Sequence, residues 1–182
     1  MGGGVSCQGG PRDSGAPCAA DQGMSMRRPP RLHASAYTGA GRYFLTIHAF
    51  PGTRPVASSA TVADVVLQLL HIAAAHGYSV LAYCFMPDHL HILVEAVSAD
   101  ADLRRFAKTF KQVTGFAHHR ATGEQLWQEG YYDRVLRREE HTATVVGYIW
   151  ANPVRKGLVA EIRDWPYSGS EVYRLQDWTG RV

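Results

Sequence analysis

The segment MPDHLHILVE (residues 86–95) decides how we interpret the rest of this chain. A turn-forming proline and aspartate precede an apolar run, which predicts a buried strand over residues 89–95. Side chains alternate between the two faces of a strand, so His89 and His91 share one face while Leu90 points to the other. Two imidazoles side by side can supply half of a divalent-metal site.

The apolar pattern on both sides of this segment alternates between strand and helix periods. We expect strands over residues 43–50 and 78–85, a helix capped by Thr61 that ends at His76 and Gly77, a hairpin joining 78–85 to 89–95, a helix opening at Ser98, a strand within 127–136, and a helix from about Glu139.

This order of elements is strand, helix, strand, strand, helix, strand, and one further helix. It is the pattern of a ferredoxin-like α+β fold, an antiparallel sheet with helices on one face. The other face is then left open for a ligand. The final helix carries Tyr148, whose phenol oxygen could serve as a nucleophile.

Length and composition indicate one globular domain. A chain of 182 residues with 46% apolar and 19% charged residues can bury one core. Residues 1–36 are rich in Gly, Pro, Ser and Ala and show no apolar period, so we expect a disordered tail there. Residues 37–182 are then a single globular domain. The net charge of +3 does not by itself identify a nucleic-acid binder.

The cysteines and the hydropathy pattern favour a cytoplasmic protein. Cys7, Cys18 and Cys84 lie far apart, without metal-finger or redox spacing. No apolar run approaches the roughly 20 residues needed to span a bilayer. The pair Arg27 and Arg28 is followed by prolines and not by an apolar stretch, so we expect no export signal and no membrane partner.

Basic side chains cluster after residue 103. Between residues 103 and 120 there are basic residues and no acidic ones, and this pattern can follow a phosphate backbone or form an ordinary solvated helix face. The candidates for DNA contact, including later arginines and a lysine, are Arg104, Arg105, Lys108, Lys111, Arg134, Arg137, Arg138, Arg155 and Lys156.

Tyr148 and Asn152 are four residues apart and therefore share one face of a helix. In a functional interpretation, Tyr148 is a nucleophile and Asn152 supplies a third metal ligand through its carbonyl oxygen. The alternative is structural: Tyr148 packs on the sheet, and Asn152 begins a turn because Pro153 follows it. The histidines could likewise be held by hydrogen bonds at the sheet surface.

Three segments together resemble the single-tyrosine HUH transposases, in particular the REP-associated tyrosine transposases of bacteria. They are YCFMPDHLH (residues 83–91), WQEGYYDR (residues 127–134) and YIWANPVRKGLV (residues 148–159). The likeness extends from about residue 37 to residue 173. The first and third segments are specific in combination.

The resemblance implies that His89, His91 and Asn152 bind Mg²⁺ or Mn²⁺ and that Tyr148 is the nucleophile. It implies cleavage and rejoining of single-stranded hairpin DNA through a 5′-phosphotyrosine, the chemistry of DNA transposition. The acting unit is a monomer or a homodimer. Pro153 fits the family pattern, and its missing N–H would leave the carbonyl of residue 149 without its helical partner.

Two other functions remain open at this stage. A metal-dependent nuclease could activate water and use Tyr148 only structurally. A non-catalytic protein could recognise hairpin DNA through its basic helix and the open sheet. Formation of a covalent protein–DNA adduct separates the transposase from the nuclease, and DNA binding without metal favours the non-catalytic protein.

Overall fold

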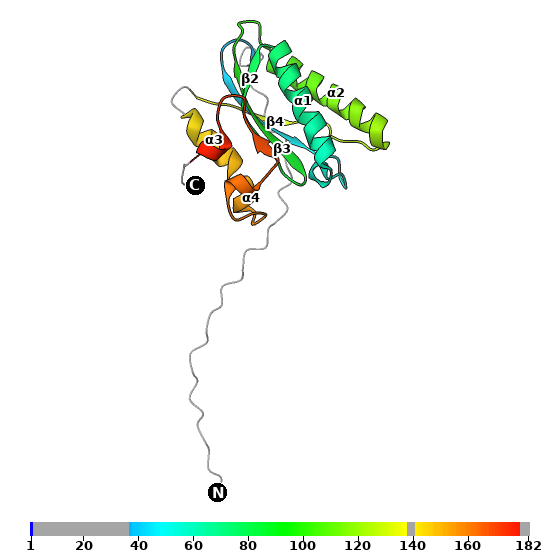
Figure 1. Ribbon diagram of the computed structural model, residues 1–182, viewed down its shortest axis with the longest axis vertical. Helices are drawn as coiled ribbons and strands as arrows, with labels where there is room; N and C mark the ends of the chain where they lie inside the picture. Colours follow the sequence, from blue (N-terminus) through cyan, green and yellow to red (C-terminus); the bar gives the residue numbers. More distant parts are fainter. Residues whose placement is uncertain (2–36, 138–140, 179–182) are drawn as a thin grey trace.

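The computed structural model describes residue 1 and residues 37–137 and 141–178 (Figure 1). The expected tail, Arg138 and the expected helix start at Glu139 lie outside these residues, apart from residue 1. In chain order the elements are β1 (Arg42–His48), the 3-10 helix η2 (Pro55–Ala57), α1 (Ser59–Ala75), β2 (Tyr78–Phe85), β3 (His89–Ala96), α2 (Leu103–Thr122), β4 (Tyr132–Val135), α3 (Thr142–Trp150), α4 (Asn152–Arg155), the 3-10 helix η3 (Ile162–Asp164), β5 (Ser168–Gly169) and the 3-10 helix η4 (Leu175–Asp177).

The strands form one antiparallel sheet in the order β4-β1-β3-β2-β5. β2 and β3 make the expected hairpin. β1 lies between β3 and β4, and its register places Thr46 opposite His91 and His48 opposite His89. The first four strands and their two helices follow the ferredoxin-like order, so the predicted α+β fold is confirmed.

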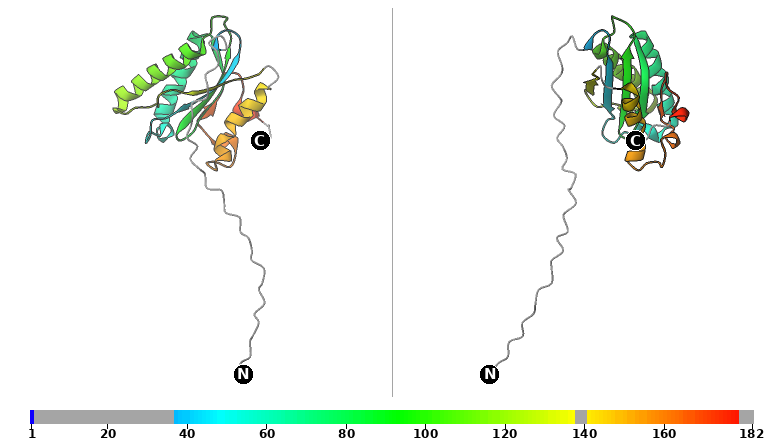
Figure 2. Two further views of the ribbon diagram at one scale, coloured as in Figure 1. Left: turned by 180° about the vertical axis from the view of Figure 1, so that it is seen from behind. Right: turned by 90° about the vertical axis from the view of Figure 1, so that its left-hand side faces the viewer.

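Helices α1 and α2 cover one face of the sheet, and the two views in Figure 2 show the same layering. The side chains that meet there come from both helices and from the inner strands. Removal of this apolar surface from water is the main stabilising contribution. Fully buried members of this cluster are Leu45, Ile47, Leu69, Ile92, Phe106 and Phe110.

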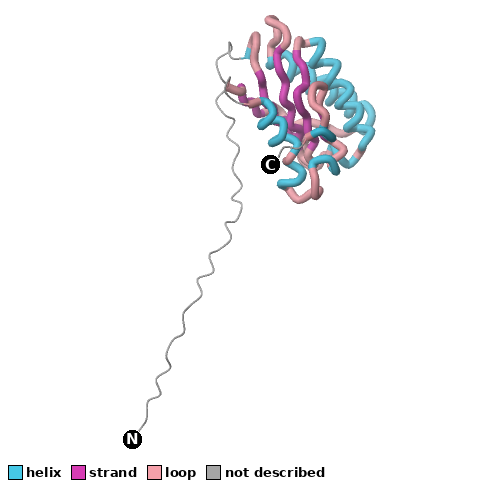
Figure 3. The backbone as a smooth tube through the Cα atoms, turned by 60° about the vertical axis from the view of Figure 1, so that its left-hand side comes forward, coloured by secondary structure: helices cyan, strands magenta, loops and turns pink. Residues whose placement is uncertain are grey.

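Helix α3 packs on the opposite face, which the sequence analysis expected to be open. Ile149 and Trp150 form a second apolar cluster with Cys84 of β2 and Leu93 of β3. Figure 3 shows the strands between α3 on one side and the long helices on the other. The face is covered because α3 has its own apolar stripe to bury. Two cavities on this face border β1, and one of them also borders β4.

The helices begin at residues other than those predicted. Ser58, and not Thr61, caps α1, since its hydroxyl accepts a hydrogen bond from the Thr61 N–H. Asp102, and not Ser98, caps α2 by accepting from the N–H groups of residues 104 and 105. No helix in the described ranges is both long and apolar enough to cross a bilayer.

The segment after η3 closes the free edge of β2. The two-residue strand β5 pairs with Tyr83 and Cys84, and the Phe85 N–H donates to the Tyr167 carbonyl at 2.9 Å. The indole N–H of Trp165 donates to the Phe85 carbonyl at 2.8 Å. β5 was not among the strands predicted from the sequence.

Candidate active site

The two histidines occupy the first rungs of β3, where the sheet meets the turn of residues 86–88. The alternation of the strand places both rings on the face opposite the α1 and α2 core, as predicted. Their Nε2 atoms lie 3.0 Å apart. His91 is 9% exposed and His89 is partly exposed, so the pair lies at the boundary between core and solvent.

The other nitrogen of each ring is held by a side chain. The Asp88 carboxylate accepts from Nδ1 of His89 at 2.6 Å. The Thr46 hydroxyl lies 3.0 Å from Nδ1 of His91. A carboxylate can only accept, so the proton of a neutral His89 sits on Nδ1, and its Nε2 lone pair faces Nε2 of His91, from which it can accept a hydrogen bond. Such outer partners are the ones that orient metal-binding histidines.

The environment keeps His91 neutral. Burial lowers the pKa of His91 to about 3, and the neighbouring His89 and His48 act in the same direction. The Phe44 ring stacks on His91 with the ring centroids 5.3 Å apart. Burial and His89 also lower the pKa of His48, against an opposing effect of Asp88. Neutral imidazoles are the form that binds a metal ion.

The geometry of the pair fits a divalent cation. At a separation of 3.0 Å, two nitrogens that each lie about 2.1 Å from an ion subtend roughly 90° at it, the angle between neighbouring octahedral ligands. Histidine, cysteine and carboxylate groups in the described chain do not assemble three potential ligands. A third protein ligand would have to be of another kind, and the amide oxygen of Asn152 is the predicted one.

Asn152 sits at the junction of α3 and α4. We expected Tyr148 and Asn152 on one continuous helix, but α3 ends at Trp150 and α4 begins at Asn152. The cause is Pro153, which cannot donate to the Ile149 carbonyl. The Asn152 side-chain amide donates instead, to the Tyr148 carbonyl at 2.9 Å and to the Ile149 carbonyl at 3.2 Å. Its side-chain oxygen is not used in these bonds.

Tyr148 is accessible and shares a cavity with two side chains that contact His91. Its side chain is 47% exposed, and the Arg155 guanidinium carbon lies 4.8 Å from the ring centroid. Tyr148 also lines a cavity of about 530 Å³ together with Phe44 and Thr46, which both contact His91. We refer to it as the Tyr148 cavity, and its lining also includes Tyr132, Arg134 and Thr144.

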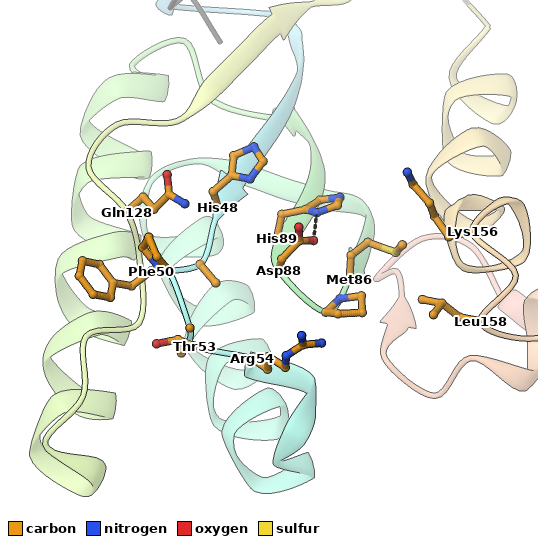
Figure 4. Close-up of a pocket in the computed structure, with 14 residues that line it drawn as sticks. His48, Phe50, Thr53, Arg54, Met86, Asp88, His89, Gln128, Lys156 and Leu158 are labelled. Atoms are coloured by element: carbon orange, nitrogen blue, oxygen red, sulfur yellow. Dashed lines mark hydrogen bonds and ion pairs between the residues drawn. The ribbon is translucent and has the colours of Figure 1, made fainter. Parts of the chain in front are cut away.

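A second cavity lies at the other end of the pair (Figure 4). We refer to it as the Lys156 cavity; it has a volume of about 590 Å³. In Figure 4, Phe50 and Gln128 lie on one side of it and Lys156 on the other. Its lining includes Phe50, Arg54, Met86, His89, Gln128 and Lys156.

Apart from Arg137, which follows β4, and Arg138, which lies outside the described residues, the predicted DNA-contacting residues fall into two groups. Arg134, Arg155 and Lys156 lie around the two cavities. The basic side chains of α2 lie on the helix that covers the opposite face of the sheet, so the structure does not bring them to the histidines. The α2 residues concerned are Arg104, Arg105, Lys108 and Lys111.

Two residues of the α2 set, and one from the later group, have structural contacts. Arg104 lies over the Tyr37 ring, with its guanidinium carbon 5.9 Å from the ring centroid. Lys111 donates to the Gln128 carbonyl at 2.5 Å and also to the Gly130 carbonyl. Arg137 offers its backbone carbonyl to the guanidinium of Arg42 at 3.1 Å. Lys111 therefore anchors the segment that leads into β4.

The comparisons with known proteins identify the family. A family model described as "Transposase IS200 like" matches residues 53–152, a range that includes both histidines, Tyr148 and Asn152. The chain belongs to this family. The predicted resemblance to tyrosine transposases is thereby confirmed at the family level.

The relatives of this IS200-like transposase point the same way. A Haemophilus influenzae protein named as a REP-associated tyrosine transposase is 27% identical over 124 residues, covering 58% of this chain and 69% of that protein. The REP-associated tyrosine transposase of Escherichia coli K12 is 25% identical over 120 residues, covering 63% of this chain and 70% of the relative.

A solved structure supports the fold of this family member. The structure of a REP-associated tyrosine transposase bound to a REP hairpin superposes with a TM-score of 0.65 at 21% sequence identity. It covers 83% of this chain and 90% of the solved chain. The likeness shows a shared fold.

Sequence reasoning did not identify several residues at the site of this transposase. Asp88 was read only as a turn residue, although its position next to His89 could have suggested a partner for the ring. Thr46 has no local signal, because its contact with His91 depends on strand register. Arg54 and Gln128 come together only in the folded chain.

Proposed function

We propose that this protein cleaves and rejoins single-stranded hairpin DNA, with Tyr148 as the nucleophile and a divalent cation held by His89, His91 and Asn152. The observation that carries the proposal is the histidine pair. Its Nε2 atoms converge to 3.0 Å while Asp88 and Thr46 hold the opposite nitrogens. An arrangement of this kind is preorganised for a ligand that the two rings share.

Mn²⁺ and Mg²⁺ are the proposed cations. Two imidazole nitrogens and one amide oxygen suit Mn²⁺ well, whereas Mg²⁺ prefers a set composed of oxygens. When bound, the cation would polarise the scissile phosphate and offset the negative charge that develops on its oxygens.

The chain's own residues then define the reaction. The Tyr148 oxygen forms a bond to phosphorus, and the bond from phosphorus to the 3′-oxygen of the preceding nucleotide breaks. The phenol proton passes to solvent, and the departing 3′-oxygen takes up a proton. The products are a 5′-phosphotyrosine and a free 3′-hydroxyl. Because the covalent bond keeps the energy of the phosphodiester, the reverse attack rejoins a strand without ATP.

The support for Tyr148 is its placement. It lines a cavity with Phe44 and Thr46, the two residues that contact His91 from β1. Arg155 lies over its ring, which restricts where the phenol can point. The Asn152 amide bonds to the Tyr148 carbonyl, so the nucleophile and the proposed third ligand are fixed to the same helix end.

The hairpin substrate is proposed from the relatives. One solved REP-associated tyrosine transposase is bound to a REP hairpin. The walls of the two cavities carry the basic residues Arg54, Lys156 and Arg134 beside the acidic Asp88 and Asp133, on the same face as the pair. Basic side chains in such positions neutralise phosphates.

The test compares Tyr148→Phe with the wild type. Both proteins are incubated with hairpin-bearing single strands and Mn²⁺, and the products are separated under denaturing conditions. The wild type should give a protein–DNA adduct and a cleaved strand, and Tyr148→Phe should bind the DNA and give neither. The matched control is Tyr132→Phe, which removes a phenol oxygen from the same cavity and should still form the adduct.

Other outcomes would favour the alternatives. Cleavage by Tyr148→Phe at the native rate would make water the nucleophile and the protein a nuclease. An adduct that persists in Tyr148→Phe and disappears in Tyr132→Phe or Tyr131→Phe would move the nucleophile to β4 or to the residue before it. Hairpin binding by the wild type with no cleavage would indicate a non-catalytic protein.

A further inference from the structure

We propose that the nucleotide on the 5′ side of the scissile phosphate occupies the Lys156 cavity, where Gln128 and Phe50 contact its base. This nucleotide is the one released with the free 3′-hydroxyl. The inference rests on the proposed function, because it takes Tyr148 as the nucleophile and the histidine pair as the position of the scissile phosphate.

The first step is the order of side chains along the sheet face. β1 and β3 pair antiparallel with His48 opposite His89, Thr46 opposite His91, and Phe44 opposite Leu93. Residues two apart on a strand lie on the same face, about 6.7 Å from each other. We call each such pair of opposite residues a rung. The rungs run in a line from the pair His48 and His89 at the strand end toward the pair that contains Phe44.

The two cavities lie at opposite ends of this line. The Lys156 cavity is lined by His48 and His89 and by the loops beyond the strand ends. The Tyr148 cavity is lined by Thr46 and Phe44, on the second and third rungs. His89 lines the Lys156 cavity, and His91 lies opposite Thr46, which lines the Tyr148 cavity. A strand with its phosphate at the pair therefore has one neighbouring nucleotide toward each cavity.

The reaction geometry then assigns each side. In an in-line displacement at phosphorus, the attacking and leaving oxygens lie on opposite sides of the phosphorus atom. The attacking oxygen belongs to Tyr148 and comes from the Tyr148 cavity. The leaving 3′-oxygen and its nucleotide must then lie toward the other end of the line, which is the Lys156 cavity.

The Lys156 cavity has the chemistry that a nucleotide requires. Arg54 and Lys156 are exposed basic residues in its wall, suited to a phosphate. Phe50 is 40% exposed, so its ring can stack against a base. The Gln128 amide offers both a donor and an acceptor for a base edge. In Figure 4, Gln128 lies beside His48 and Lys156 lies across the opening, while the Phe50 ring projects outward at the rim.

Gln128 is held firmly enough to act in recognition. Its backbone N–H donates to the His48 carbonyl at 2.9 Å, and its carbonyl accepts from Lys111 at 2.5 Å. The exposed side chain thus projects from a backbone that is anchored on both sides. Lys111 is a positioning residue in this scheme, since it acts on the nucleotide only through the Gln128 segment.

The experiment uses base removal at single positions. Cleavage by the wild type first maps the scissile phosphate. Binding is then measured in Tyr148→Phe, which leaves the strand intact, with hairpin strands that carry one abasic nucleotide immediately 5′ or immediately 3′ of that phosphate. We expect the 5′ abasic site to weaken binding about tenfold, in keeping with loss of one stacked and hydrogen-bonded base.

The assignment is tested by coupling between protein and DNA changes. Phe50→Ala and Gln128→Ala, each added to Tyr148→Phe, should weaken binding of the intact strand several-fold. In these double variants, removal of the 5′ base should then lower the binding affinity only slightly further. The penalty for a 3′ abasic site should be unchanged in both. Gln112→Ala, an exposed glutamine on α2, is the matched control and should leave both penalties as they are.

Two results would overturn the proposal. Coupling of Phe50 and Gln128 to the 3′ base would place the 3′ nucleotide in the Lys156 cavity. Absence of coupling to either base would mean that neither base occupies this cavity. These failures differ from failure of the proposed function. If the wild type forms no adduct, the function and the assignment fall together; if it forms an adduct without coupling at the 5′ base, only the assignment falls.

Discussion

The two faces of the sheet have the same strands and opposite tasks. The face under α1 and α2 is closed by a continuous apolar cluster that includes Leu45, Ile92 and Phe106. The face under α3 is apolar over β2 and polar over β1 and the start of β3, where the histidine pair and both cavities lie. The first face stabilises the fold. The second face accommodates polar side chains and therefore buries less apolar surface.

The comparison teaches that alternation along a strand lets one segment serve both tasks. Leu90 and Ile92 enter the core, while His89 and His91 between them face the site. A rigid core directly beneath the histidines keeps their spacing fixed. Substitutions on the two faces should therefore separate stability from chemistry.

The largest effect should come from the closed face. Phe106→Ala removes a fully buried ring between α2 and the sheet and should lower the free energy of unfolding by about 3–5 kcal/mol, measured by chemical denaturation. Phe116→Ala on the same helix is the control, because that ring is 65% exposed and its loss should cost less than about 0.5 kcal/mol. Equal losses in both variants would contradict the layering.

On the site face, His91→Ala should abolish metal binding and leave the fold intact. We expect Mn²⁺ affinity to fall by more than about 100-fold, since loss of an outer partner alone typically costs 10- to 100-fold. Because His91 is buried against Phe44, the free energy of unfolding should fall, but by less than in Phe106→Ala. Calorimetric titration measures the first and denaturation the second. His119→Ala, an exposed histidine of α2, should bind Mn²⁺ like the wild type.

A smaller effect is expected one contact away. Thr46→Val keeps the shape of the side chain and removes the hydroxyl that lies 3.0 Å from Nδ1 of His91. The ring loses its orienting partner, so Mn²⁺ affinity should fall by about 10- to 100-fold. Thr109→Val on α2 provides the same exchange on the other face. Wild-type affinity in Thr46→Val would mean that the hydroxyl does not orient the ring.

The smallest effect concerns the salt dependence of hairpin binding. Lys156 lies on the site face, whereas Lys108 is exposed on α2. If DNA crosses the site face, Lys156→Met should reduce the slope of log affinity against log salt by about one unit, and Lys108→Met should leave it unchanged. The reverse pattern, measured by anisotropy at several salt concentrations, would place the DNA along α2 as the sequence analysis first suggested.

The sequence alone predicted the features that depend on local pattern. Strand β2 was predicted at its observed bounds because a glycine and a turn enclose the apolar run. The alternation of His89 and His91 was enough to place both on one face. The helix starts were predicted less accurately, because several polar residues near each start can serve as the N-cap. In the folded chain, Ser58 and Asp102 are the caps, since their side chains accept backbone hydrogen bonds.

What could not be predicted depends on relations between distant segments. The contact of Thr46 with His91 requires the register of β1 against β3, which no local pattern specifies. The side of the sheet on which α3 packs follows from the path of the chain after β4. The approach of Gln128, Arg54 and Lys156 to one cavity likewise results from three separate loops.

The short strand β5 has a consequence for solubility. Without it, β2 would present a long, almost wholly apolar edge with unpaired backbone groups, the kind of edge that pairs with other chains. The indole of Trp165 and the backbone at Tyr167 satisfy Phe85 at that edge. We expect a chain ending after residue 164 to keep every described candidate site residue but to self-associate more readily, because the β2 edge would be unpaired. The segment after residue 164 thus covers the β2 edge and limits its pairing with other chains.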